Sequence, residues 1–120
     1  MFVNKNMKLN MKIVGTANVL NNISLWQKIR FREKIKNALN KTRLKIENDA
    51  RRMAPKDTGA LKASIWSEMK SDTQAVVADG VYYGMFQELG TRNHPPQPFL
   101  MPAFEANRKV LERELKEMLD

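Results

Sequence analysis

Alternation between apolar and polar residues marks the first element of the chain. Leu9, Met11 and Ile13 are separated by single polar residues. In an extended chain every second side chain points to the same face, so this period of two predicts a short strand that ends before Gly15.

From about Leu25 the apolar residues recur every three or four positions instead. Residues at these steps lie on one side of a helix. This apolar face consists of Phe31, Ile35, Ala38, Thr42, Ile46, Ala50 and Met53. The pattern predicts a long amphipathic helix that ends near Met53, because Pro55 disfavours helical geometry at the residue before it and cannot donate to the helical hydrogen bonds.

The second half of the chain predicts a hairpin and two further helices. The stretch Leu61–Met69 alternates apolar with polar residues, which indicates a half-buried strand, and "QAVVADG" follows as its antiparallel partner after the turn "KSDT". A short helix "VYYGMFQEL" ends at Gly90, a residue suited to a left-handed cap. A last amphipathic stripe consists of Phe104, Leu111, Leu115 and Met118.

This order of elements predicts an α+β domain. We expect the long helix and the C-terminal helix to pack on a small, mainly antiparallel sheet, within one domain over residues 1–120. Residues 1–16 form an N-terminal extension with the first strand, and residues 90–102 form a projecting, proline-rich loop.

The net charge of +8 is unevenly distributed. Residues 1–56 contain 14 Lys and Arg against 3 Asp and Glu, whereas residues 57–120 contain 7 against 10. Clustered cations are typical of a phosphate-binding face. The opposite signs also fit self-association, with the basic half of one copy against the acidic half of the next. A basic helix face that is merely solvated gives the same pattern, so all three interpretations stay open.

Composition argues against most catalytic chemistry. The chain has no Cys and a single His, His94, so disulfides, thiolate metal sites and His-rich metal sites are excluded. There is no glycine-rich phosphate loop and no serine in a nucleophile elbow. We therefore expect no enzyme activity, cofactor, metal or small-molecule substrate. No stretch is long and apolar enough to span a bilayer, and no secretion signal is present, so we expect synthesis inside a cell and no membrane partner.

Three separated motifs resemble one family. The motifs are "ARRMAPKDTGALKASIW", "YYGMFQELGT" and "PPQPFLMPAFEAN". Together they are similar to the tail-component family of tailed bacteriophages, the head-tail joining or tail-completion proteins of long-tailed phages and prophages. The matching positions are Ala54, Pro55, Thr58, Gly59, Leu61, Ser64, Ile65, Tyr83, Glu88, Gly90, Thr91, Pro98, Phe99, Pro102 and Ala103.

This resemblance implies a structural virion protein, made in the bacterial host cytoplasm and located in the neck or upper tail. Family members assemble as rings that join the head to the tail tube, and no catalytic residues come with the family. The implied partners are other copies of the chain and neighbouring neck or tail proteins, with weak, nonspecific DNA contact in the channel as a further expectation. A small basic protein that binds nucleic acid through the helix 28–52 is the alternative function.

Two structural hypotheses follow for the matching residues. Ala54, Pro55, Thr58 and Gly59 form a turn that sets the direction of the following strand. The prolines stiffen the later loop, which reduces the entropy lost when it docks. We expect that loop to insert Phe99 into a neighbouring protein; the competing interpretation is that Phe99 packs on its own core. The interface residues under the first hypothesis are Gly90, Thr91, Pro98, Phe99, Leu100, Met101 and Pro102.

The basic helix offers a second candidate surface. Its face comprises Lys34, Lys41, Lys45, Arg51 and Arg52. This face meets either the acidic C-terminal helix of the next subunit or DNA in the ring lumen. In the first case, ring formation should weaken as salt rises.

Overall fold

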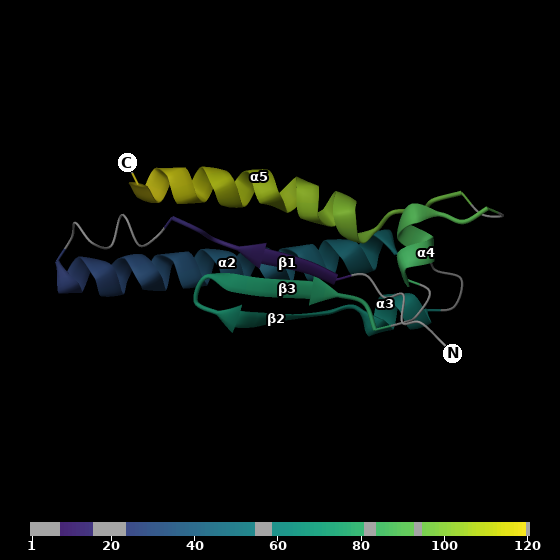
Figure 1. Ribbon diagram of the computed structural model, residues 1–120, viewed down its shortest axis with the longest axis horizontal. Coiled ribbons are helices and arrows are strands. Elements are labelled where there is room, and N and C mark those ends of the chain that lie inside the picture. The colour runs from purple at the N-terminus through teal and green to yellow at the C-terminus, as the bar shows by residue number, and fades with distance from the viewer. Residues whose placement is uncertain (1–7, 16–23, 55–58, 81–83, 93–94, 120) are drawn as a thin grey trace.

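The computed structural model describes residues 8–15, 24–54, 59–80, 84–92 and 95–119 (Figure 1). The strands are β1 (Lys8–Lys12), β2 (Trp66–Ser71) and β3 (Gln74–Ala78). The helices are α2 (Leu25–Met53), α3 (Ala60–Ser64), α4 (Gly84–Leu89) and α5 (Leu100–Leu119). The predicted α+β class is confirmed, because helices pack on a small antiparallel sheet.

The sheet has three antiparallel strands in the order β1-β3-β2. Val77 of β3 lies opposite Leu9 on one side and Ser67 on the other, so the predicted hairpin and first strand are both confirmed. One face of the sheet packs on α2, and α5 packs beside α2 on the side of β1 (Figure 1). Strands β1 and β2 are therefore the two edges of the sheet.

Helix α2 begins and ends where its sequence signals it should. Ser24 caps the first turn: its Oγ accepts from Gln27 N at 3.3 Å, while Gln27 Oε1 accepts from Ser24 N at 3.0 Å. This reciprocal pair satisfies N–H groups that have no partner inside the helix. At the other end Ala54 is extended, with φ −62° and ψ 141°, as expected of a residue before proline.

The buried face of α2 differs slightly from the predicted one. Leu39 is fully buried although the predicted face omits it, and Met53 is 41% exposed although that face includes it. Leu39 lies one position after Ala38, on the flank of the apolar face that α5 covers. The width of a buried helix face depends on how many elements pack on it, which the helical period alone does not show.

The predicted strand over Leu61–Met69 is wrong in its first half. Residues Ala60–Ser64 form the short helix α3, and β2 starts at Trp66. Leu61 and Ile65 are both buried, and their spacing of four residues fits one helical turn as well as it fits alternation. Gly59 precedes α3 with φ 70°, a left-handed conformation that confirms a glycine-dependent bend at this position. Pro55 and Thr58 lie outside the described residues.

Helix α4 ends as predicted, at a left-handed Gly90 with φ 79°, whose N–H donates to Phe86 O at 2.8 Å. Helix α5 starts earlier than its predicted stripe, at Leu100 instead of near Phe104. Its first turn consequently includes Pro102, at a position where the missing N–H has no helical partner to lose.

Candidate interaction surfaces

The proline-rich segment is held to the body of the molecule by Glu88. This residue is 4% exposed, and its carboxylate faces the first turn of α5. Glu88 Oε1 accepts from Leu100 N at 2.8 Å and from Phe99 N at 3.4 Å, and Oε2 accepts from Met101 N at 3.4 Å. An anion is favourable at a helix N-terminus, where N–H groups point outwards without partners. Glu88 therefore caps α5 from a different helix.

The hypothesis that Phe99 reaches into a neighbouring protein is contradicted by its position. Phe99 and Leu100 are both 0% exposed and belong to the main core, with Ile46 and Leu61. The backbone of the segment is also tied to α4, because Gln97 N donates to Gln87 O at 2.7 Å. The predicted projecting loop thus turns inwards where it joins α5, and the competing interpretation of Phe99 as a core residue holds.

The remaining predicted interface residues, unlike Phe99 and Leu100, are exposed or half-buried. Thr91, Pro98 and Met101 are exposed, Met101 by 38%, while Gly90 and Pro102 are half-buried. A partner contact through these residues stays a prediction. His94, Tyr82 and Tyr83 lie outside the described residues.

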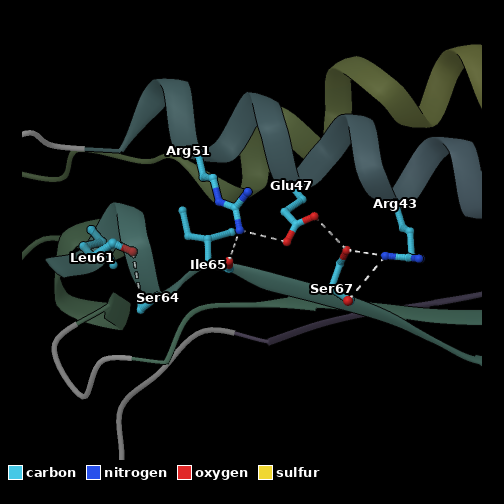
Figure 2. Close-up of polar contacts among 7 residues, drawn as sticks. All are labelled: Arg43, Glu47, Arg51, Leu61, Ser64, Ile65 and Ser67. Atoms are coloured by element: carbon cyan, nitrogen blue, oxygen red, sulfur yellow. Dashed lines mark hydrogen bonds and ion pairs between the residues drawn. The ribbon is translucent and has the colours of Figure 1, made fainter. Parts of the chain in front are cut away.

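A ladder of polar contacts joins α2 to β2, as Figure 2 shows. Arg43 Nη1 donates to Ser67 Oγ at 2.8 Å, and Ser67 Oγ donates to Glu47 Oε2 at 3.2 Å. Arg51 Nη2 donates to Glu47 Oε1 at 3.1 Å and to the carbonyl of Ile65 at 2.8 Å. The three α2 residues are spaced four apart and hence share one side of the helix. They fix the start of β2 against α2.

Most of the predicted basic face is engaged within the chain. Arg51 binds Glu47, Arg52 lies 2.6 Å from Asp49 Oδ1, and Lys41 Nζ lies 2.8 Å from Glu114 Oε1. The Lys41–Glu114 pair joins α2 to α5 of the same copy. Of the predicted set, Lys34 and Lys45 form no ion pair with another described residue.

The C-terminal helix, which is the predicted acidic partner of that face, is also less acidic than expected. Helix α5 has four acidic and four basic residues, and is therefore balanced in charge. Two of the acidic residues in the second half of the chain, Asp79 and Glu88, are buried. A contact between a basic helix and an acidic helix of the next subunit has little support in this charge distribution.

The unpaired positive charge is concentrated in the N-terminal half of α2. Five basic residues there are not in ion pairs with other described residues, and a single acidic residue, Glu33, accompanies them. They are Lys28, Arg30, Arg32, Lys34 and Lys36. Of the engaged residues, Arg51 and Arg52 pair with Glu47 and Asp49 of α2 itself, whereas Lys41 pairs with Glu114 of α5, a partner that spacing within α2 could not indicate.

Exposed apolar side chains gather at both ends of the elongated molecule, which measures 56 × 29 × 22 Å. At one end α2 extends past the strands and past the end of α5 (Figure 1). This segment, which we call the α2 tip, has Leu25 71%, Trp26 78% and Ile29 49% exposed. At the opposite end lie α4 and the start of α5, where Phe86 is 43% and Leu89 65% exposed. We call Phe86, Leu89 and Met101 the α4 end.

Exposed charges on the sheet interact locally. Glu68 Oε1 lies 2.5 Å from Lys70 Nζ. The hydrogen bond from Lys70, together with its positive charge, lowers the pKa of Glu68 below its ordinary value. Lys8 on the other edge strand and Arg43 on α2 add smaller effects in the same direction, against a small opposing effect of burial. Because Glu68 is on the surface, this pair orders side chains but contributes little to stability.

Among the described residues, no group of three or more His, Cys, Asp and Glu side chains is arranged to hold a metal ion. No helix in the same part of the chain is long and apolar enough to cross a membrane. Comparison with protein-family models, with curated proteins and with solved structures finds no match for this chain.

Proposed function

We propose that the chain is a structural protein of the neck or upper tail of a tailed bacteriophage, where copies form or complete a ring between head and tail. The observation that supports this proposal is the exposure of large apolar side chains at both ends of the molecule. Apolar patches on a protein surface mark contact sites with other proteins. A closed ring requires two different patches on each copy, since each contact joins one patch to the other.

The motif residues support this role indirectly, because they shape the surface beside the exposed apolar residues. Glu88, Gly90, Phe99 and Pro102 build the junction between α4 and α5, and this junction presents Leu89 and Met101 at the α4 end. In this proposal the motif shapes the contact surface, and the exposed residues beside it make the contact. The prolines then serve to fix the junction in one conformation.

The experiment uses variants in which one end is disabled. Trp26→Glu places a charge on the α2 tip and Leu89→Glu on the α4 end, and both sites are exposed enough to leave folding intact. Leu44→Glu is the matched control, because Leu44 is 40% exposed on α2 away from both ends. Light scattering after size-exclusion chromatography gives the mass of each species.

We expect the unmodified chain and Leu44→Glu to form closed oligomers, and each end variant to be monomeric. An equal mixture of Trp26→Glu and Leu89→Glu should form dimers, because one intact end of each kind remains available. Patches that bind their own kind would instead leave each single variant dimeric. An unmodified chain that stays monomeric at every concentration, with no rings in electron micrographs, contradicts the proposal.

Nucleic-acid binding is the second candidate, and the five unpaired cations of the N-terminal half of α2 favour it. Neutralising phosphates releases counterions, so affinity for duplex DNA should fall steeply with salt. The double variant Arg30→Glu/Lys34→Glu should abolish binding of a fluorescent duplex, and Lys62→Glu, an exposed cation on α3, should leave it unchanged. If Arg30→Glu/Lys34→Glu binds the duplex as tightly as the unmodified chain does, DNA binding through this part of α2 is excluded.

A further inference from the structure

The outer edge of β1 presents backbone groups for another strand. Ile13 N donates to Thr73 O at 2.7 Å, next to the paired residues Lys12 and Gln74, so Ile13 faces β3. In an antiparallel pair alternate residues face the same neighbour. The N–H and C=O groups of Asn10 and Lys12 consequently point away from β3. Among the described residues, none pairs with this edge.

Beside this edge lies an apolar groove of about 370 Å³. One wall is the end of β1 and the residues that follow it, with Met11, Ile13 and Val14, and Leu39 of α2 also lines the groove. The other wall is α5, which runs alongside β1 in Figure 1. The apolar residues of that wall are Phe104, Leu111 and Leu115.

The two walls suit an extended chain in particular. A strand paired with β1 would place every second side chain over the groove, against the apolar side chains of α5. Phe104 and Leu115 are only partly buried, so apolar surface remains there to be covered. A guest strand paired with β1 would extend the sheet towards α5. Peptides recognised in this way gain affinity from main-chain bonds and specificity from alternate side chains.

The charged side chains of the edge strand β1 favour one kind of guest segment over others. Lys8 and Lys12 are exposed and form no ion pair with another described residue, whereas Arg108 on the opposite wall is already paired with Glu105 and Glu112. Opposite charges on neighbouring strands attract, and like charges directly opposite are unfavourable. A second copy of β1 would oppose lysine to lysine in an antiparallel pair. The favoured guest has carboxylates on the side chains that face away from the groove.

We propose that the β1–α5 groove binds an extended segment of a partner protein in which apolar residues alternate with Asp or Glu. The segment adds as a fourth strand at the edge of β1, with its apolar side chains on α5 and its carboxylates beside Lys8 and Lys12. This binding depends on neither ring formation nor DNA binding and can be tested on the isolated chain.

The probe is a synthetic peptide of alternating Glu and Val, blocked at both ends, and its control has Lys in place of Glu. Amide hydrogen exchange followed by NMR reports each N–H separately. In the free protein the N–H groups of Asn10 and Lys12 should exchange fast, and those of Met11 and Ile13 slowly. The acidic peptide should slow exchange at Asn10 and Lys12 by about tenfold or more, and the basic peptide should have no effect.

Two variants test the mode of binding. Lys12→Pro removes an N–H that points away from β3, a position at which an edge strand tolerates proline, and should abolish binding while Met11 N–H stays protected. The double variant Lys8→Glu/Lys12→Glu changes exposed side chains only and should reverse the preference, so that the basic peptide binds.

Three results overturn the proposal. The first is slow exchange at Asn10 and Lys12 before any peptide is added, which would mean that the edge is already covered. The second is equal binding, or no binding, of the two peptides by the unmodified chain. The third is a double variant that keeps the original preference.

Discussion

Phe99 shows how a single residue decides between two interpretations of a loop. Its side chain is fully buried in the core, so its removal should leave a cavity. We expect Phe99→Ala to lower the free energy of unfolding by about 3–5 kcal/mol. Phe86→Ala is the control, because Phe86 is 43% exposed, and should cost far less. Urea unfolding followed by circular dichroism measures both. A stable Phe99→Ala variant that fails to assemble would restore the idea of a docking side chain.

Glu88 contributes through three backbone N–H groups that it satisfies at once. Its truncation in Glu88→Ala leaves these buried donors without an acceptor, and we expect a loss of about 2–3 kcal/mol in unfolding free energy. Glu88→Gln keeps one acceptor oxygen but loses the negative charge. Its unfolding free energy should lie between those of Glu88→Ala and the unmodified chain. Glu105→Ala, at an exposed site on α5, controls for a general effect of charge. Equal stability of all three variants would exclude a capping role.

The elements of this fold were predictable from sequence where one local signal was sufficient. The helical period places the start of α2 near Leu25, Pro55 defines its end, and Gly90 defines the end of α4. The alternation over Leu61–Met69 predicts a strand where helix α3 forms, because five residues contain too little periodicity to separate a helical turn from alternation. The inward turn at Phe99 could not be predicted either, since it depends on Glu88, eleven residues away, and on packing against α2.

The N-terminal cap of α2 should affect the α2 tip more than the whole fold. Ser24 and its partner Gln27 are exposed, and the tip extends beyond the other elements. Replacing Ser24 by Ala removes an acceptor worth about 1 kcal/mol to the helix. We expect faster amide exchange at Gln27 and Lys28 but an unchanged exchange rate at core positions such as Ile46. Ser24→Asp keeps an acceptor, so its amides at Gln27 and Lys28 should exchange as slowly as those of the unmodified chain. An equal loss of protection at Ile46 would show that the tip and the core unfold as one unit.

At the scale of the whole molecule, the sequence indicated that charge matters but did not indicate where. The excess of Lys and Arg in residues 1–56 is real, yet Arg43, Arg51, Arg52 and Lys41 bind partners within the same copy. Among the described residues, five of the cations without an ion pair lie in the N-terminal half of α2, and Lys8, Lys12 and Lys45 lie elsewhere. Local spacing within α2 accounts for the pairs of Arg51 and Arg52, whereas the contacts of Lys41 with Glu114 and of Arg43 with Ser67 depend on the folded arrangement.

This distribution changes the expected effect of salt on assembly. Both ends have an exposed cation beside their apolar side chains, Arg30 at the α2 tip and Arg92 after the α4 end. A contact between the two ends therefore brings like charges together, and salt screens that repulsion without weakening apolar burial. We expect the association constant from sedimentation equilibrium to rise, or to stay level, between about 50 mM and about 500 mM salt. Arg92→Gln should remove part of the repulsion and flatten this dependence. Association that weakens as salt rises would instead support the attraction between basic and acidic helices that the sequence first suggested, and would place the subunit contact on other surfaces than the two ends.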